Sequence, residues 1–556
     1  MDNSSENEVK EVVPKKKNIV IPVIIILAVL CCAGFLGFKY FENGKKPVDK
    51  EVNIPKINGS FRMSGNGLEN FDLAFLQLED KKENVVYSPL SIKYALHMLS
   101  EGANGETKTQ IDDIIGDYKS HKYENNEHMA FANALFVKDT YQKYVNNDFV
   151  NNLKSKYNAD VLYDSFKSPS AVNSWVSKNT LGQINNFADN VDDADYMLIN
   201  ALGIDMEWIH LIQPAYFEDD EMITDYQERY GNSRLDYFVN YENEKYSQYI
   251  QAIMENHYTG LKFNQNDLVK SLIFGATINK YDIINDLGED NIRKNITKLY
   301  DEWKKDDSCS WNSSAYKNTD EFVNEYIEAL GKNYKQYSSS TDFSLYDDNE
   351  VKVFAKDLKT YNNTTLQYVG IMPKKADLAD YIKNTNSEKI SNLISNLKTI
   401  DLANFEDGVI TNIIGAIPLF NYSYTLSLDE DLKKLGITNV FDSEKADLSK
   451  LSTEKSIIKT SHKADIEFSN EGIKASAATS STGYGDIDCN FEYLYKVPVK
   501  NIDLTFDKPY IYLIRDKKTN EVWFVGKVYE PTKYERKEGL DEDIVFDIKE
   551  YLYTEK

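Results

Sequence analysis

The chain has 556 residues, enough for one large domain or several small ones. Its formal net charge of −25 at pH 7 argues against nucleic acid as a partner, and its 42% of hydrophobic residues can build a substantial core. The sequence contains no H-E-x-x-H, G-x-S-x-G or glycine-rich phosphate loop, and no cysteine pair has zinc-site spacing. We therefore expect neither an enzyme nor a bound metal or cofactor.

Residues 18–38 form a long span without charge. At about 1.5 Å per residue the span covers roughly 31 Å, close to the thickness of a bilayer core. The lysines at 15–17 favour a cytoplasmic N-terminus. We expect a cytoplasmic tail (1–17), a single-pass anchor in the cell membrane, a stalk (39–60) and the rest of the chain outside. The alternative is a cleaved signal peptide, which is usually shorter and ends in a small-x-small site that this sequence does not show.

Local patterns after the stalk predict a helix, a strand and a second helix. Apolar residues recur at helical spacing over 67–80, and 84–87 reads as a short strand. Ser88 is then a typical N-cap, with Pro89 in the first helical turn. Gly102 is expected to end this second helix.

A segment of different composition interrupts the main domain, which we place at 61–535. Residues 206–342 are rich in Tyr, Asn, Asp and Glu, and we interpret them as an acidic insertion. Helical patterns within it lie around 246–254 and 320–330. The chain ends in an acidic tail, 536–556.

The most informative stretch is 469–483, a run of small residues. It lies between a predicted strand at 461–468 and a predicted strand–turn–strand at 508–528. In an extended chain alternate side chains share one face, so one whole face would be small enough to enter between two strands. That face comprises Ala475, Ala477, Thr479, Ser481 and Gly483. The alternative is a flexible linker, but a linker needs no such alternation.

Seven motifs, in order along the chain, resemble those of the serpin family. They are 84–92, 102–107, 132–137, 172–176 with 182–184, 198–201 with Trp208, 432–437 with 441–442, and 507–510 with 524–528 and Pro531. The resemblance implies an α+β serpin-like fold with a large central β-sheet, surrounding helices and an exposed reactive loop. Together with the predicted N-terminal transmembrane helix and the Lys-, Asn-, Ile- and Tyr-rich composition, it indicates a membrane-anchored bacterial protein.

The resemblance also implies a function as a suicide-type protease inhibitor. A serine or cysteine protease would cleave the loop, and the loop would then insert into the central sheet and trap the protease. The implied partners are that protease and the membrane, and we expect a monomer. The alternative is a non-inhibitory binding or scaffold protein that acts through its insertion. Small side chains on the inward face favour inhibition.

The reactive loop can be mapped onto this sequence by the same resemblance. The residues of its hinge are Glu471, Gly472, Ile473, Ala475, Ala477, Ala478 and Thr479. Ile473 occupies the first inserted position, where the family prefers Thr or Ser. Counting forward from Gly472 puts the cleaved bond at Asp486–Ile487, whereas counting back from Pro509 puts it at 497–498 or 498–499. We favour the forward count because family loops vary more after the cleaved bond.

A polar cluster beneath the sheet can be mapped in the same way. Its residues are Ser88, Ser91, Asn200 and His462. A buried histidine needs hydrogen-bond partners, and Asn200 is the partner that the family implies. We expect the cluster to hold the sheet closed and not to catalyse. Trp208 is expected where insertion begins, with plain core packing as the alternative.

Overall fold

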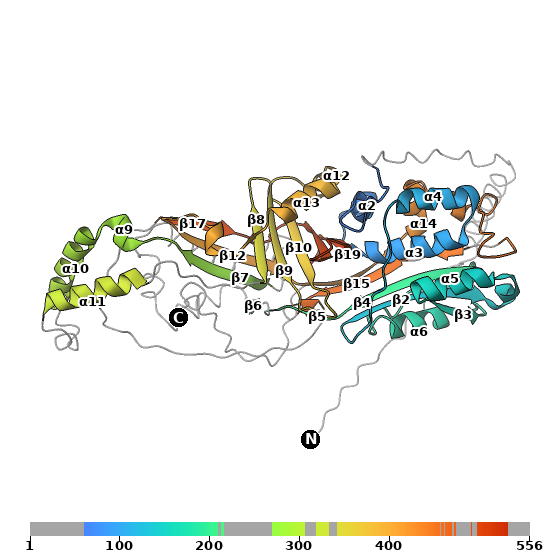
Figure 1. Ribbon diagram of the computed structural model, residues 1–556, viewed down its shortest axis with the longest axis horizontal. Coiled ribbons are helices and arrows are strands. Elements are labelled where there is room, and N and C mark those ends of the chain that lie inside the picture. The colour runs from blue at the N-terminus through green and yellow to red at the C-terminus, as the bar shows by residue number, and fades with distance from the viewer. Residues whose placement is uncertain are drawn as a thin grey trace, which may run out of the picture. The chain divides into compact units, whose positions relative to one another are not determined.

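The computed structural model describes residues 60–209, 213–215, 270–305, 318–332, 342–455, 458–460, 462–469, 472–473, 491 and 498–531 (Figure 1). These residues belong to one compact unit, 57–556. None of the helices within these ranges is both long and apolar enough to cross a bilayer. The predicted anchor at 18–38 and the acidic tail lie outside the described residues and stay predictions.

The fold combines helices with four β-sheets, as the α+β class requires. The described helices are α2 (Asn70–Leu78), α3 (Pro89–Gly102), α4 (Gly105–Ile115), α5 (Asn147–Tyr157), α6 (Ser170–Lys178), α9 (Ile283–Leu287), α10 (Glu289–Trp303), α11 (Thr319–Lys332), α12 (Leu378–Lys383), α13 (Ser387–Ser395) and α14 (Leu428–Lys434). The largest sheet is antiparallel and has seven strands. Their order is β1 (Val85–Tyr87), β19 (Val522–Val528), β18 (Tyr510–Asp516), β10 (Leu366–Pro373), β9 (Val351–Asp357), β8 (Phe343–Asp347) and β11 (Lys398–Thr399).

The other three sheets have four strands each. One has the order β17 (Val499–Asp503), β12 (Ile410–Pro418), β7 (Lys270–Asn279) and β6 (Gln213–Ala215). The second has the order β13 (Phe420–Leu426), β15 (His462–Phe468), β16 (Gly472–Ile473) and β5 (Met206–Glu207). The third has the order β14 (Ile458–Thr460), β4 (Tyr196–Ile204), β2 (Met129–Lys138) and β3 (Asp160–Asp164).

The first predicted elements are confirmed with small shifts in their bounds. The helix expected over 67–80 is α2, and the strand expected over 84–87 is β1. Ser88 caps α3, because its hydroxyl oxygen accepts a hydrogen bond from the Ser91 N–H at 3.1 Å. Pro89 is the first residue of α3, where its missing N–H leaves no bond unmade.

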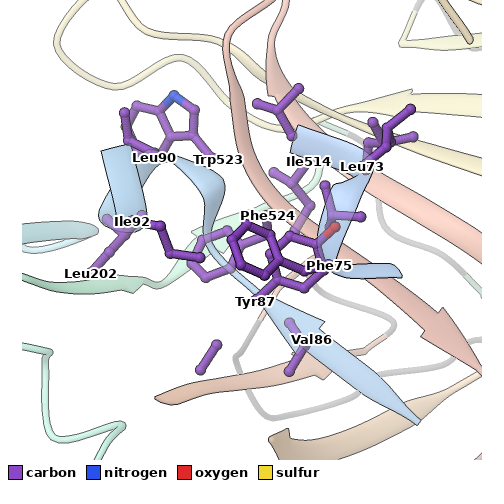
Figure 2. Close-up of a cluster of buried hydrophobic side chains, with 14 of the residues drawn as sticks. Leu73, Phe75, Val86, Tyr87, Leu90, Ile92, Leu202, Ile514, Trp523 and Phe524 are labelled. Carbon is purple, nitrogen blue, oxygen red and sulfur yellow. The ribbon is translucent and has the colours of Figure 1, made fainter. Parts of the chain in front are cut away.

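A core of buried side chains joins these N-terminal elements to the C-terminal hairpin. Figure 2 shows Leu73 and Phe75 of α2, Tyr87 of β1 and Phe524 of β19 in one cluster, with Leu202 of β4 nearby. All are almost fully buried. Burying a large apolar side chain contributes roughly 1.5–3 kcal/mol, so this cluster ties the two ends of the domain together.

Strands β4 and β15 each leave part of one edge without a partner in the described chain. β4 pairs with β2 along its whole length, but on its other side it pairs only with β14, at 196–198. β15 pairs with β13 along its whole length, but on its other side it pairs only with β16, at Phe468. We call the space between 199–204 of β4 and 462–467 of β15 the β4–β15 gap.

The predicted insertion, 206–342, contains strands that belong to the sheets around it. β5 and β6 begin the segment, and β7 pairs antiparallel with β12 from Lys270 to Asn279. The sequence pattern did not predict β7 as a strand, because polar segments precede and follow it. Helix α11 agrees with the helix predicted around 320–330, whereas 246–254 lies outside the described residues.

Candidate functional site

The two-residue strand β16 closes one end of the β4–β15 gap. Ile473 pairs antiparallel with Phe468 of β15 on one side and with Met206 of β5 on the other. β5 follows directly after β4, so β16 lies between the two long strands where the gap begins. Ile473 is 2% exposed and faces the core, as does Phe468 opposite it. The chain therefore already contains the first two residues of an additional strand.

Trp208 holds the turn that leads from β15 into β16. Its Nε1 donates a hydrogen bond to the carbonyl oxygen of Ser469 at 3.0 Å. Its ring is fully buried and lies 5.4 Å from the ring of Phe468 and 6.2 Å from that of Tyr368, measured between centroids. Trp208 thus combines core packing with a directional bond beside β16, and its role in insertion stays a prediction.

A cavity of about 510 Å³ opens at the β16 end of the gap, beside Ile204 of β4 and Ile466 of β15. Its inner wall consists of apolar side chains from four strands, Ile204, Ile466, Ile473 and Phe524. Its outer wall consists of polar groups, among them Gln183, Asn185, Asp465 and Glu467. Burial raises the pKa of the Asp465 carboxyl. The cavity therefore reaches from the polar outer face of the sheet to the core, as a site for a strand with two different faces requires.

The chain that follows α6 lies across the gap and contacts both of its edges. Gln183 Nε2 donates to the carbonyl oxygen of Ile204 at 2.5 Å. Lys463 Nζ of β15 donates to the carbonyl oxygen of Asn186 at 2.8 Å. The approach to β4 is so close that a Cβ on Gly203 would lie 2.6 Å from the carbonyl oxygen of Thr180. Any strand that enters the gap must pass beneath this segment.

The structure brings together three of the four predicted polar residues. His462 Nε2 accepts a hydrogen bond from the Ser88 N–H at 2.9 Å, and Ser88 in turn accepts from Ser91. Asn200 bonds elsewhere, because its amide donates to Asn133 Oδ1 at 2.6 Å. Asn200 Oδ1 is buried and has no hydrogen-bond partner among the described residues. The expected Asn200–His462 bond is therefore replaced by an Asn200–Asn133 bond.

Two contributors to the site, Asn133 and Gln183, were given no role from the sequence. Both lie within the serpin-like motifs at 132–137 and 182–184. Asn133 is an amide in strand β2, whose other residues are apolar except for the last, Lys138. The Asn133 amide donates to the Tyr157 carbonyl at 2.8 Å. A single amide in such a strand is the signal that could have identified it, since a buried amide must find partners.

Most of the predicted loop lies outside the described residues. This applies to Glu471, Ala475, Ala477, Ala478, Thr479, Asp486 and Ile487. The competing bond at 498–499 is described, and it lies where β17 begins. The Pro498 carbonyl accepts from the Ile410 N–H at 2.9 Å, and Val499 pairs with Ile410. This bond is part of a hydrogen-bonded sheet. Within the described ranges, no cluster of His, Cys, Asp or Glu side chains has the geometry of a metal site.

Comparisons with known proteins agree on one family. The sequence profile named "Serpin (serine protease inhibitor)" matches residues 71–230 and 269–531, and so omits a shorter segment than the predicted insertion. Human serpin A9 is 24% identical over 495 residues, which cover 84% of this chain and 88% of that protein. Mouse leukocyte elastase inhibitor A is 29% identical over 173 residues, which cover 31% of this chain and 42% of that protein.

Solved structures show the same fold. The native state of tengpin, a thermophilic serpin, has a TM-score of 0.53 at 22% identity and covers 84% of this chain and 93% of its own. Thyroxine-binding globulin in complex with thyroxine has a TM-score of 0.51 at 17% identity and covers 83% of this chain and 98% of its own. At these identities the likeness shows the fold alone.

The burial of His462 predicts a pH-dependent stability. Desolvation lowers its pKa from the ordinary 6.5 to about 3, so folding favours the neutral ring. The free energy of folding that comes from keeping His462 neutral is fully present above pH 6.5 and is lost as the pH falls toward 3. At pH 5 it has fallen by about 2 kcal/mol, at 1.36 kcal/mol per pKa unit. Urea unfolding should show that His462→Gln, which keeps an acceptor for the Ser88 N–H, loses about 2 kcal/mol less than wild type between pH 7 and 5. An equal loss in both proteins would contradict the buried neutral histidine.

Proposed function

Because this chain belongs to the serpin family, we propose that it is a suicide-type inhibitor that traps serine or cysteine proteases by inserting its cleaved loop. The observation that carries the proposal is β16, which already pairs with both β15 and β5 at the mouth of the β4–β15 gap. The edges at 199–204 of β4 and 462–467 of β15 have no strand partner in the described chain, so they can supply the backbone partners that a longer strand needs.

The register of β16 determines where each following residue would lie. Continued residue by residue, it sets Ala475 between Ile466 and Ile204, and Ala477 between Ala464 and Leu202. Thr479 would then lie between His462 and Asn200. Ala475, Ala477 and Thr479 would share the inward face of Ile473, because side chains alternate along a strand. Lys474, Ser476 and Ala478 would face outward.

The register matches the chemistry of the gap. The inward positions beside the apolar wall are alanines, which need little space. The inward position beside the polar cluster is a threonine, whose hydroxyl can donate to the unpartnered Asn200 Oδ1. The predicted strand therefore suits the gap both in size and in hydrogen-bonding groups.

The proposed mechanism is a competition between two rates. The protease nucleophile attacks the carbonyl carbon of the cleaved bond, and the new N-terminus leaves as an amine while the upstream segment stays bonded to the enzyme as an ester or thioester. Water would then release the enzyme. Insertion of the upstream segment carries the bound protease away and distorts it before water attacks, so the yield of trapped protease depends on fast insertion.

Ala477→Arg is expected to convert the inhibitor into a substrate. The charge would be buried without a partner at a cost of several kcal/mol, so insertion would slow while cleavage continues. Ala478→Arg is the matched control, because the same side chain would lie on the outward face. Denaturing gels after mixing with a panel of serine and cysteine proteases measure the covalent complex. A wild-type yield of complex from Ala477→Arg would refute this account of the hinge.

Thr479→Val tests the proposed hydrogen bond from the Thr479 hydroxyl to Asn200 Oδ1 without changing the size of the side chain. Valine keeps the size of threonine but removes the hydroxyl, so the stability of the uncleaved protein should not change. The cleaved protein should lose about 1–3 kcal/mol, the cost of leaving a buried polar group without its bond. Urea unfolding of both forms measures this difference. An equal effect on the cleaved and uncleaved forms would contradict the register.

We also propose that residues 18–38 anchor the inhibitor in the cell membrane with the serpin domain outside. The uncharged span and the preceding lysines support this topology. The full chain should sediment with membranes after a carbonate wash, and protease added to whole cells should remove the domain. Recovery of the domain in the soluble fraction, with a new N-terminus after residue 38, would instead indicate a cleaved signal.

A further inference from the structure

Helices α10 and α11 form a pocket of aromatic rings that holds Phe491. The ring centroid of Phe491 lies 5.4 Å from Tyr300, 5.8 Å from Trp303, 5.1 Å from Phe322 and 5.3 Å from Tyr326. All four contacts are edge-on, with interplanar angles between 75° and 90°. This is the arrangement that aromatic quadrupoles favour. We call these four side chains the aromatic socket.

The socket rests on a small core of its own. Ile292 and Ile296 of α10 pack with Val323 and Ile327 of α11 behind the aromatic rings. Tyr300 and Phe322 stack with their centroids 3.6 Å apart, which joins the two helices beside Phe491. Packing within and between α10 and α11 therefore holds the four rings in place. Phe491 comes from a segment far away in sequence and fills the socket that they form.

Phe491 lies in the connection between β16 and β17, which contains the proposed reactive loop. The socket follows the far end of β7. The first residues of β7, from Lys270, pair with β6, and β6 follows β5 in the chain. The last residues of β7 lead to Tyr281, which belongs to the core of the socket. The socket therefore lies on the β5 side of the β4–β15 gap and not on the β14 side.

We propose that the aromatic socket anchors Phe491 and thereby prevents the uncleaved chain from inserting along the whole length of β4. This inference rests on the proposed function. Whole-length insertion would bring Gly483 opposite Tyr196, about 33 Å from Ile473 at ~3.3 Å per residue. Residues 484–491 can return over at most about 28 Å at ~3.5 Å per residue. An anchored Phe491 is then out of reach.

The anchor also selects which cleavage is productive. A cut between Gly483 and Phe491 frees the upstream segment while Phe491 stays in the socket. A cut after Phe491 leaves the upstream segment attached to the socket and therefore unable to insert fully. The Asp486–Ile487 bond satisfies this condition, whereas the bonds at 497–498 and 498–499 do not.

Phe491→Ala in the full chain tests the anchor. Loop insertion in serpin-like folds should raise resistance to urea, so the uncleaved proteins are incubated without protease and the resistant fraction is followed over time. Phe491→Ala should convert about ten-fold faster than wild type or more, because four aromatic contacts are lost. Phe491→Leu should convert at an intermediate rate. Tyr163→Ala, at an exposed tyrosine of β3, is the control and should match wild type.

Two outcomes would overturn the inference, and they can be told apart. If wild type gains urea resistance on cleavage but Phe491→Ala converts no faster than wild type when uncleaved, the anchor is wrong and the proposed function stands. If cleaved wild type gains no resistance, no strand has been inserted, and both the proposed function and the anchor are wrong.

Discussion

The need of buried backbone groups for hydrogen-bond partners is the constraint on which the rest of this structure depends. β4 and β15 lie on either side of a cavity. Among the described residues, the short strand β14 pairs with β4 at one end, and the short strand β16 pairs with β15 and β5 at the other. A backbone N–H or C=O withdrawn from water without a partner costs free energy comparable to a lost hydrogen bond. The described part of the fold thus contains a gap that one more strand would complete.

Between 199–204 of β4 and 462–467 of β15, the contacts that the described residues show across the gap come from side chains and not from a backbone ladder. The segment after α6 bonds to Ile204 through Gln183 and to β15 through Lys463. Trp208 secures the turn into β16, and His462 ties β15 to the start of α3. Each of these is a single contact, and the proposed insertion would have to break some of them while the surrounding sheets stay intact.

Local patterns predicted the elements of this site, but long-range contacts decided its details. The strand predicted at 461–468 corresponds to β15, and Ser88 with Pro89 predicted the start of α3, because short strands and helix caps depend on neighbouring residues. The partner of Asn200 could not be read from the sequence, since Asn133 lies on another strand. Phe491 was likewise not identified, because its role depends on helices far away in sequence. β7 was not predicted as a strand because polar segments lie on both sides of it.

In the proposed insertion, the position of β14 would make the last stage an exchange of strands. In the register of β16, residues 481–483 would need the edge of β4 at 196–198, which β14 already occupies in parallel pairing. The incoming segment would separate β14 from β4 one residue pair at a time. It would replace the parallel pairs with antiparallel pairs, which are slightly more stable. The exchange would start beside 199–204 of β4, the part of that edge which has no strand partner in the described chain.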